Sequence, residues 1–204
     1  MGKWMSNLKG LFKSGPMKEM AESVSEPAEK RAVAEEVKFT DEFKQRFSER
    51  RLLSPEQRSS FQFSLLVMAA YIVQADGKVE EEEYAYMSKF LGRNFGPEAE
   101  QESMDVLRKL VKKYEDLATT KPNAYLQFLG ECGQQMSELL SEDLRYQLLS
   151  MLVMIVKSDG VVDVREMTAL KDVAIYMGLK GEHVDSLMVL DASLAKEGWP
   201  VLNY

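Results

Sequence analysis

The sequence predicts an all-α protein: a bundle of about seven helices in two pseudo-symmetric halves, preceded by an N-terminal amphipathic helix and a flexible linker. Three observations predict this fold. Apolar residues recur with helical spacing and never alternate convincingly with polar ones, glycine and proline separate the helical stretches, and one unit of sequence occurs twice. The 204 residues suffice for one domain and an appendage.

Residues 1–15 hold the first expected element, an amphipathic helix over residues 3–13. Its apolar stripe comprises Trp4, Met5, Leu8, Leu11 and Phe12, and its lysines off that stripe are Lys3, Lys9 and Lys13. Residues 1–18 carry a charge of +4, because they contain four lysines and no acid, whereas the remainder carries −11. Such a helix suits an anionic membrane surface or a protein partner, and docking on the chain's own body is the alternative.

A flexible linker is expected over residues 16–38, which are rich in Glu, Ala, Ser and Lys and include Pro27. The helical domain is then expected over residues 39–204, with repeats at about 54–117 and 122–196. Its helices are predicted at about 54–75, 81–94, 97–117, from 122 onward, 141–158, 164–177 and 182–196.

Capping residues and helix-breaking residues set these bounds. They are Ser54-Pro55, Gly96-Pro97, Lys121-Pro122, Ser141, Gly178, and Gly198 with Pro200. The stretches Phe61–Val73 and Leu144–Val156 are apolar on nearly all sides. We therefore expect these two helices to form the central, buried pair.

The repeated unit spans Leu65–Phe90 and returns as Leu148–Val173 at a constant offset of 83 residues, with nine of 26 positions identical. Each copy contains Asp-Gly-x-Val-x-x-x-Glu. The glycines supply the positive φ that ends a helix. With Glu80 and Asp163 as N-caps, Glu83 and Glu166 fall at the third helical position, which predicts a capping box in each copy.

Asp76 and Asp159 need a further explanation, because the helix dipole disfavours a carboxylate at a helix C-terminus by about 0.3–1 kcal/mol. Backbone amides at the start of the next helix are one possible partner. A divalent cation (Ca²⁺, Mg²⁺ or Mn²⁺) is the other, with candidate ligands Asp76, Glu80, Glu83, Asp159, Asp163 and Glu166. An EF-hand is excluded, since its first ligand positions would fall on Ile72 and Ile155.

The repeated motif, followed by Leu-Gly or Met-Gly-Leu, resembles the tellurite-resistance TerB family over about residues 54–196. It is also similar to the N-terminal region of membrane-attached DnaJ-like co-chaperones. The resemblance implies a seven-helix bundle, acidic pairs proposed to bind metal (Asp76 with Glu83, Asp159 with Glu166), and a role in stress response at the inner membrane surface. Co-chaperone activity does not carry over, because His183 is followed by Val-Asp and not by Pro-Asp.

Little in the sequence favours catalysis. The chain has one cysteine, Cys132 in an apolar helical pattern, one histidine, and no glycine-rich phosphate loop. The net acidic body argues against a nucleic-acid partner, and no small-molecule substrate is inferred. Without a secretory signal or an apolar run long enough to cross a bilayer, we expect a cytoplasmic protein, with peripheral attachment to the inner membrane face as an option.

We therefore expect a non-enzymatic adaptor in stress response that binds or senses a divalent cation and docks through residues 3–13. Two alternatives stay open: a purely structural interaction subunit without metal, and a metal-dependent hydrolytic or sequestering domain.

Overall fold

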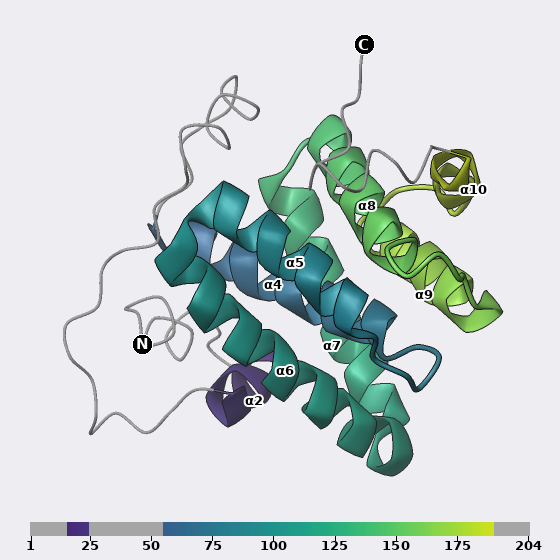
Figure 1. The fold of residues 1–204 in the computed structure, drawn as a ribbon. Helices are drawn as coiled ribbons and strands as arrows, with labels where there is room; N and C mark the ends of the chain where they lie inside the picture. Colours follow the sequence, from purple (N-terminus) through teal and green to yellow (C-terminus); the bar gives the residue numbers. More distant parts are fainter. Residues whose placement is uncertain (1–15, 25–54, 190–204) are drawn as a thin grey trace.

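The structure, a computed structural model, describes residues 16–24 and 55–189, and every regular element in these ranges is an α-helix (Figure 1). The helices are α2 (Pro16–Val24), α4 (Pro55–Val73), α5 (Glu81–Phe95), α6 (Pro97–Thr120), α7 (Pro122–Leu139), α8 (Glu142–Val156), α9 (Val164–Tyr176) and α10 (Glu182–Met188). The predicted all-α class and the seven helices of the main domain are confirmed. Both ends of α4, α5, α6, α8 and α9 lie within three residues of the predicted bounds, and α7 begins at Pro122 as predicted.

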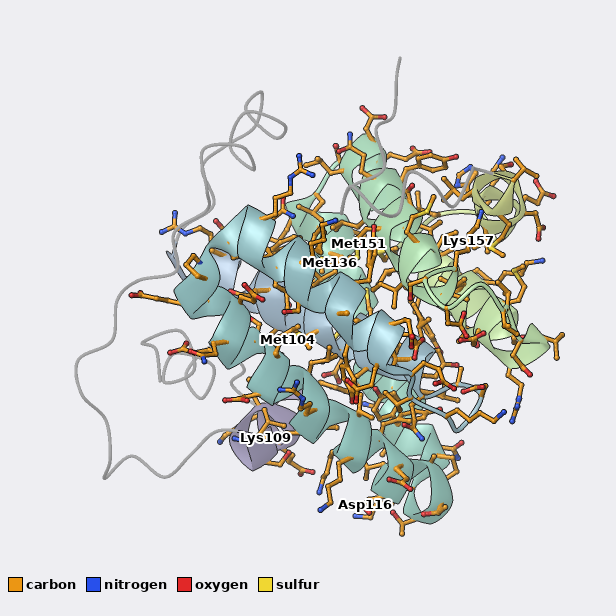
Figure 2. The ribbon with its side chains drawn as sticks, viewed as in Figure 1. Met104, Lys109, Asp116, Met136, Met151 and Lys157 are labelled. Atoms are coloured by element: carbon orange, nitrogen blue, oxygen red, sulfur yellow. The ribbon has the colours of Figure 1, made fainter. Side chains whose placement is uncertain are left out.

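The helices α4 and α8 form the buried centre of the bundle, as predicted. Every residue of Leu65–Val73 and of Leu148–Val156 is buried. Helix α4 contacts α6, α7, α8 and α9, while α8 also contacts α5 and α10. Methionines from three helices extend into the shared core, namely Met104, Met136 and Met151 (Figure 2). Apolar residues on all sides of a helix thus indicate that other helices surround it.

Residues 16–24 correct the predicted linker, because they form the helix α2 instead of a flexible segment. Met20, Ala21 and Val24 lie on one face of α2 and are all buried, and the helix contacts α7 and α6. The low proportion of large apolar residues misled the prediction. Three apolar side chains at i, i+1 and i+4 suffice to hold a nine-residue helix against a larger core.

The two halves of the domain are joined by close contacts among α4, α7 and α9. The Tyr71 hydroxyl of α4 donates a hydrogen bond to Asp172 Oδ2 of α9 at 2.9 Å. A Cβ atom at Gly133 of α7 would lie only 2.4 Å from the Tyr176 carbonyl oxygen of α9. Only glycine therefore permits this approach of α7 to α9 within the second half, and the contacts of α4 with α7, α8 and α9 join that half to the first.

Several predictions fall outside the described residues. They are the amphipathic helix at residues 3–13, the remainder of the linker and the start of the helical domain at residues 25–54, and the continuation of the last helix beyond residue 189.

Candidate functional site

Each half of the domain contains one helix–turn–helix unit with an Asp-Gly turn, α4–α5 in the first half and α8–α9 in the second. The turn glycines adopt left-handed backbone conformations, with φ of 80° at Gly77 and 84° at Gly160. An L-residue with a side chain rarely adopts this conformation. The predicted role of both glycines is confirmed.

Asp76 and Asp159 bond to backbone amides within their own turns. The Lys78 amide donates to Asp76 Oδ1 at 2.7 Å, and the Val161 amide donates to Asp159 Oδ1 at 2.9 Å. Each aspartate thus closes an Asx-turn onto the residue two positions later. These hydrogen bonds offset the unfavourable position after a helix C-terminus, and they involve loop amides rather than those of the next helix.

The predicted capping boxes are present at the start of α5 and α9. The Glu80 amide donates to Glu83 Oε2 at 3.0 Å, and the Asp163 amide donates to Glu166 Oε2 at 2.7 Å. In the second half only, the side chain of the N-cap residue Asp163 also accepts a hydrogen bond from the Arg165 amide, two residues later, at 2.7 Å. The Arg165 guanidinium further pairs with Asp163.

Glu83 and Glu166 are buried, with exposed fractions of 3% and 7%. Their positions on the helices explain this. Tyr86, Met87 and Phe90 follow Glu83 on the buried face of α5, and Ala169, Leu170 and Val173 follow Glu166 in the same way on α9. The helical period therefore predicts the burial of both carboxyl groups, which the sequence-based prediction of caps and cation ligands did not include.

The two turns lie close enough for their charges to interact across the pseudo-symmetric halves. The negative charge of Asp76 raises the pKa of Glu166, and that of Asp159 raises the pKa of Glu83. The pKa of Asp163 in the second turn is lowered chiefly by its hydrogen bonds from Arg165, and Lys78 of the first turn lowers it further. The fold therefore brings the four acidic positions of the repeated motif into one neighbourhood.

Glu83 is the most strongly perturbed carboxyl group in this neighbourhood. Its pKa is raised to about 8, chiefly by burial and additionally by the charges of Glu166, Asp159 and Asp76, while the hydrogen bond from the Glu80 amide opposes the shift. Its second oxygen, Oε1, is buried and has no hydrogen-bond partner. Burial also raises the pKa of Glu166.

The donor chemistry fits a hard divalent cation, because carboxylate oxygens are the ligands that Ca²⁺, Mg²⁺ and Mn²⁺ prefer. Glu83 Oε1, which is buried without a hydrogen-bond partner near other carboxylates, also favours a cation as its ligand. As the side chains lie, however, no three His, Cys, Asp or Glu residues in the described ranges are grouped so that they could hold a metal ion. The turns therefore offer suitable ligands without enclosing a preformed site.

The structure also places three residues near the turns that sequence analysis did not consider. Lys78 lies within electrostatic reach of Asp163, and Val161 and Val164 are 69% and 76% exposed. Aligning the repeats gives the available signal, because Val161 and Val164 occupy the positions of Lys78 and Glu81.

Outside the turns, the candidate nucleophile is Cys132 and the candidate base is His183. Neither residue has an environment suited to catalysis. Cys132 is fully buried, and burial raises the pKa of its thiol, which keeps it protonated. His183 is half-buried, and its ring packs edge-on against Tyr146 at 5.3 Å between centroids. These residues contribute to packing.

Comparison with known proteins gives one match. A family model described as tellurite resistance protein TerB matches residues 62–189, which is more than half of the chain. No curated protein and no solved structure matches. Within the described ranges, no helix is long and apolar enough to span a membrane. The matched region contains both Asp-Gly turns, all of α8 and the buried part of α4 from residue 62 onward, and the chain belongs to the TerB family.

Proposed function

We propose that this TerB protein is a non-enzymatic adaptor that binds a divalent cation at its paired Asp-Gly turns and docks through residues 3–13. One observation carries the cation proposal. Glu83 Oε1 is buried without a hydrogen-bond partner, and the charges of Asp76, Asp159 and Glu166 act on the same carboxyl group. A cation among these carboxylates would offset both the repulsion and the burial cost.

The chain's own residues have separate roles in this proposal. Asp76 and Asp159 are accessible from the surface, and each uses one carboxylate oxygen in its Asx-turn. Each retains a second oxygen for a ligand. Glu83 and Glu166 would supply the inner ligands, while Glu80 and Asp163 stand at the outer edge as helix caps.

The proposed docking element is the basic stripe of residues 3–13. Its lysines and large apolar side chains suit an anionic membrane surface or an acidic protein surface. Helix α2 begins at Pro16 and is held against α7 and α6, so this segment would remain tied close to the folded domain.

Calorimetric titration of Ca²⁺, Mg²⁺ and Mn²⁺ tests the cation site. We expect binding to the wild type and at least a tenfold loss of affinity in Asp76→Asn/Asp159→Asn. Asparagine keeps an oxygen that can close each Asx-turn, so the fold should be retained. The matched control is Asp116→Asn, an exposed carboxylate near the C-terminal end of α6 that belongs to neither turn. Absence of binding at millimolar cation would favour the purely structural alternative.

Flotation with vesicles of anionic and of neutral phospholipid tests the membrane option. We expect recovery with anionic vesicles only, and loss of recovery in Trp4→Ser/Leu8→Ser/Phe12→Ser, which removes the apolar stripe and keeps every lysine. Equal recovery of the variant and the wild type would rule out docking through this stripe.

A further inference from the structure

The second Asp-Gly turn carries an exposed apolar patch that its own fold does not require. Val161, Val162 and Val164 are 69%, 37% and 76% exposed; we call these three residues the valine turn. The equivalent positions of the first turn are Lys78, Val79 and Glu81. The same backbone therefore forms with charged residues at the positions of Val161 and Val164, and the packing of the second half does not explain these two valines.

The surroundings of the valine turn are acidic. Without the buried Glu83 and Glu166, residues 76–83 and 159–166 contain six acids, one lysine and one arginine, which gives a formal charge of −4. The two segments interact electrostatically, as the influence of Lys78 on Asp163 and of Asp76 on Glu166 indicates. The patch is therefore apolar at its centre and negatively charged at its edge.

This chemistry selects a basic amphipathic segment as the partner, and the chain contains one. Residues 3–13 combine an apolar stripe with three lysines, and residues 1–18 contain no acid. Apolar contact at the centre of an interface with opposite charges at its rim is the usual arrangement of a specific protein contact. An anionic membrane would be repelled by the acidic edge.

The position of α2 favours docking of residues 3–13 on the valine turn of a second copy over docking on that of their own chain. Only two residues separate the stripe from Pro16, the first residue of α2. Figure 1 shows α2 beside α6, across the bundle from the turn between α8 and α9. A helix over residues 3–13, as the sequence predicts, would extend only about 16 Å, so the stripe of one copy is better placed to reach the valine turn of another.

We propose that residues 3–13 of one copy dock on the valine turn of a second copy. The protein would then self-associate through a contact between two different surfaces, the stripe of one copy and the valine turn of the other. This inference rests on the docking role proposed above for residues 3–13 and names their partner. Two copies can exchange segments reciprocally and close as a dimer, because each contributes one stripe and one valine turn.

Sedimentation velocity over a concentration series tests the proposal on the full chain. We expect the wild type to form a dimer that dissociates as the salt concentration rises. Two variants should be monomeric. One is Val161→Lys/Val164→Glu, which installs the residues of the first turn, and the other is the stripe variant Trp4→Ser/Leu8→Ser/Phe12→Ser.

Mixing the two variants provides the decisive measurement. Each retains the half of the contact that the other lacks, so the mixture should form a heterodimer held by one contact, although neither variant associates alone. An unchanged melting temperature by circular dichroism would show that Val161→Lys/Val164→Glu is folded, as expected for exposed positions.

Three results would overturn the inference: a monomeric wild type, a dimer that survives Val161→Lys/Val164→Glu, or variants that do not associate when mixed. Calorimetry and vesicle flotation test cation binding and membrane docking independently of self-association, so they show whether the proposed function fails as well. A monomeric wild type that still binds cation, or that still floats with anionic vesicles, would leave the proposed function standing without its self-association.

Discussion

The two Asp-Gly turns share an internal framework and differ at their outward-facing positions. Both have a left-handed glycine, an Asx-turn aspartate, a capping box and a buried glutamate. Four positions of the motif differ between the turns. They are residues 78, 80, 81 and 82 in the first turn and residues 161, 163, 164 and 165 in the second, and all are exposed except residue 163, which is partly exposed. Packing therefore fixes the inner residues, and any functional difference between the halves should reside in the outer ones.

The largest expected effect concerns the buried glutamates, and it would appear as a pH dependence of stability. The pKa of Glu83 is about 8 in the folded protein against an ordinary value of 4.5. Between these values the folded state binds more protons than the unfolded chain, so the free energy of unfolding falls as the pH rises. Each unit of pKa difference corresponds to about 1.4 kcal/mol, so the total loss should reach several kcal/mol.

Urea unfolding from about pH 5 to about pH 9 in the presence of a chelator measures this loss. Glu83→Gln should remove most of the pH dependence, because glutamine can still accept the hydrogen bond from the Glu80 amide without becoming charged. Glu166→Gln should remove a smaller part, since Glu166 is less deeply buried. Equal slopes in Glu83→Gln and the wild type would contradict the assignment.

The next largest effect is the loss of stability when the turn glycines are replaced, and comparing the two losses tests whether the turns have the same backbone conformation. Gly77→Ala and Gly160→Ala should each lower the free energy of unfolding by about 1–2 kcal/mol, because alanine is strained at positive φ. An added Cβ meets nothing within 4 Å at either position, so strain is the only cost and the two values should agree. Thermal and urea unfolding would measure them.

Gly130→Ala is the matched control for these glycines. Gly130 lies inside α7, and an added Cβ would make ordinary contact with Tyr176 at 3.5 Å. Alanine is favoured over glycine in a helix interior by up to about 1 kcal/mol, so this variant should be as stable as the wild type or more so. Unequal costs at Gly77 and Gly160 would show that the turns are not equivalent.

The sequence predicts the helices and the internal framework of the turns well, because both depend on local chemistry. Positive-φ glycines and the capping boxes follow from short spacings, and the central helices follow from their uniform apolarity. The helix α2 was missed because its stability comes from contacts with α7 and α6 rather than from its own composition.

The candidate site could be predicted only in part. The motif identified the acidic residues, but their mutual approach depends on how α4 and α9 pack, through contacts such as the hydrogen bond from Tyr71 to Asp172. The raised pKa of Glu83 follows from that packing. Periodicity along one helix can show that Glu83 faces inward, yet it cannot show which charges from the other half lie nearby.

A smaller effect should distinguish the two N-caps. Asp163→Ala should cost about 1 kcal/mol, because the side chain accepts from the Arg165 amide and pairs with the Arg165 guanidinium. Glu80→Ala should cost less, about 0.5 kcal/mol, since the Glu80 side chain accepts only from the third helical amide in the capping box and makes no bond to the second. Comparable losses in the two variants, measured by urea unfolding, would show that the caps are equivalent.

The smallest effect comes from giving the first turn the N-cap of the second. Glu80→Asp should raise the free energy of unfolding by a few tenths of a kcal/mol, because the shorter side chain is the better N-cap and can replace Glu80 as acceptor from the Glu83 amide in the capping box. A double-mutant cycle with Glu83→Gln would separate this gain from any change in the buried carboxyl group. A loss of stability in Glu80→Asp would mean that the longer side chain has a role in the first turn that Asp163 does not have in the second. The outer position 80 would then be part of what makes the two halves functionally different.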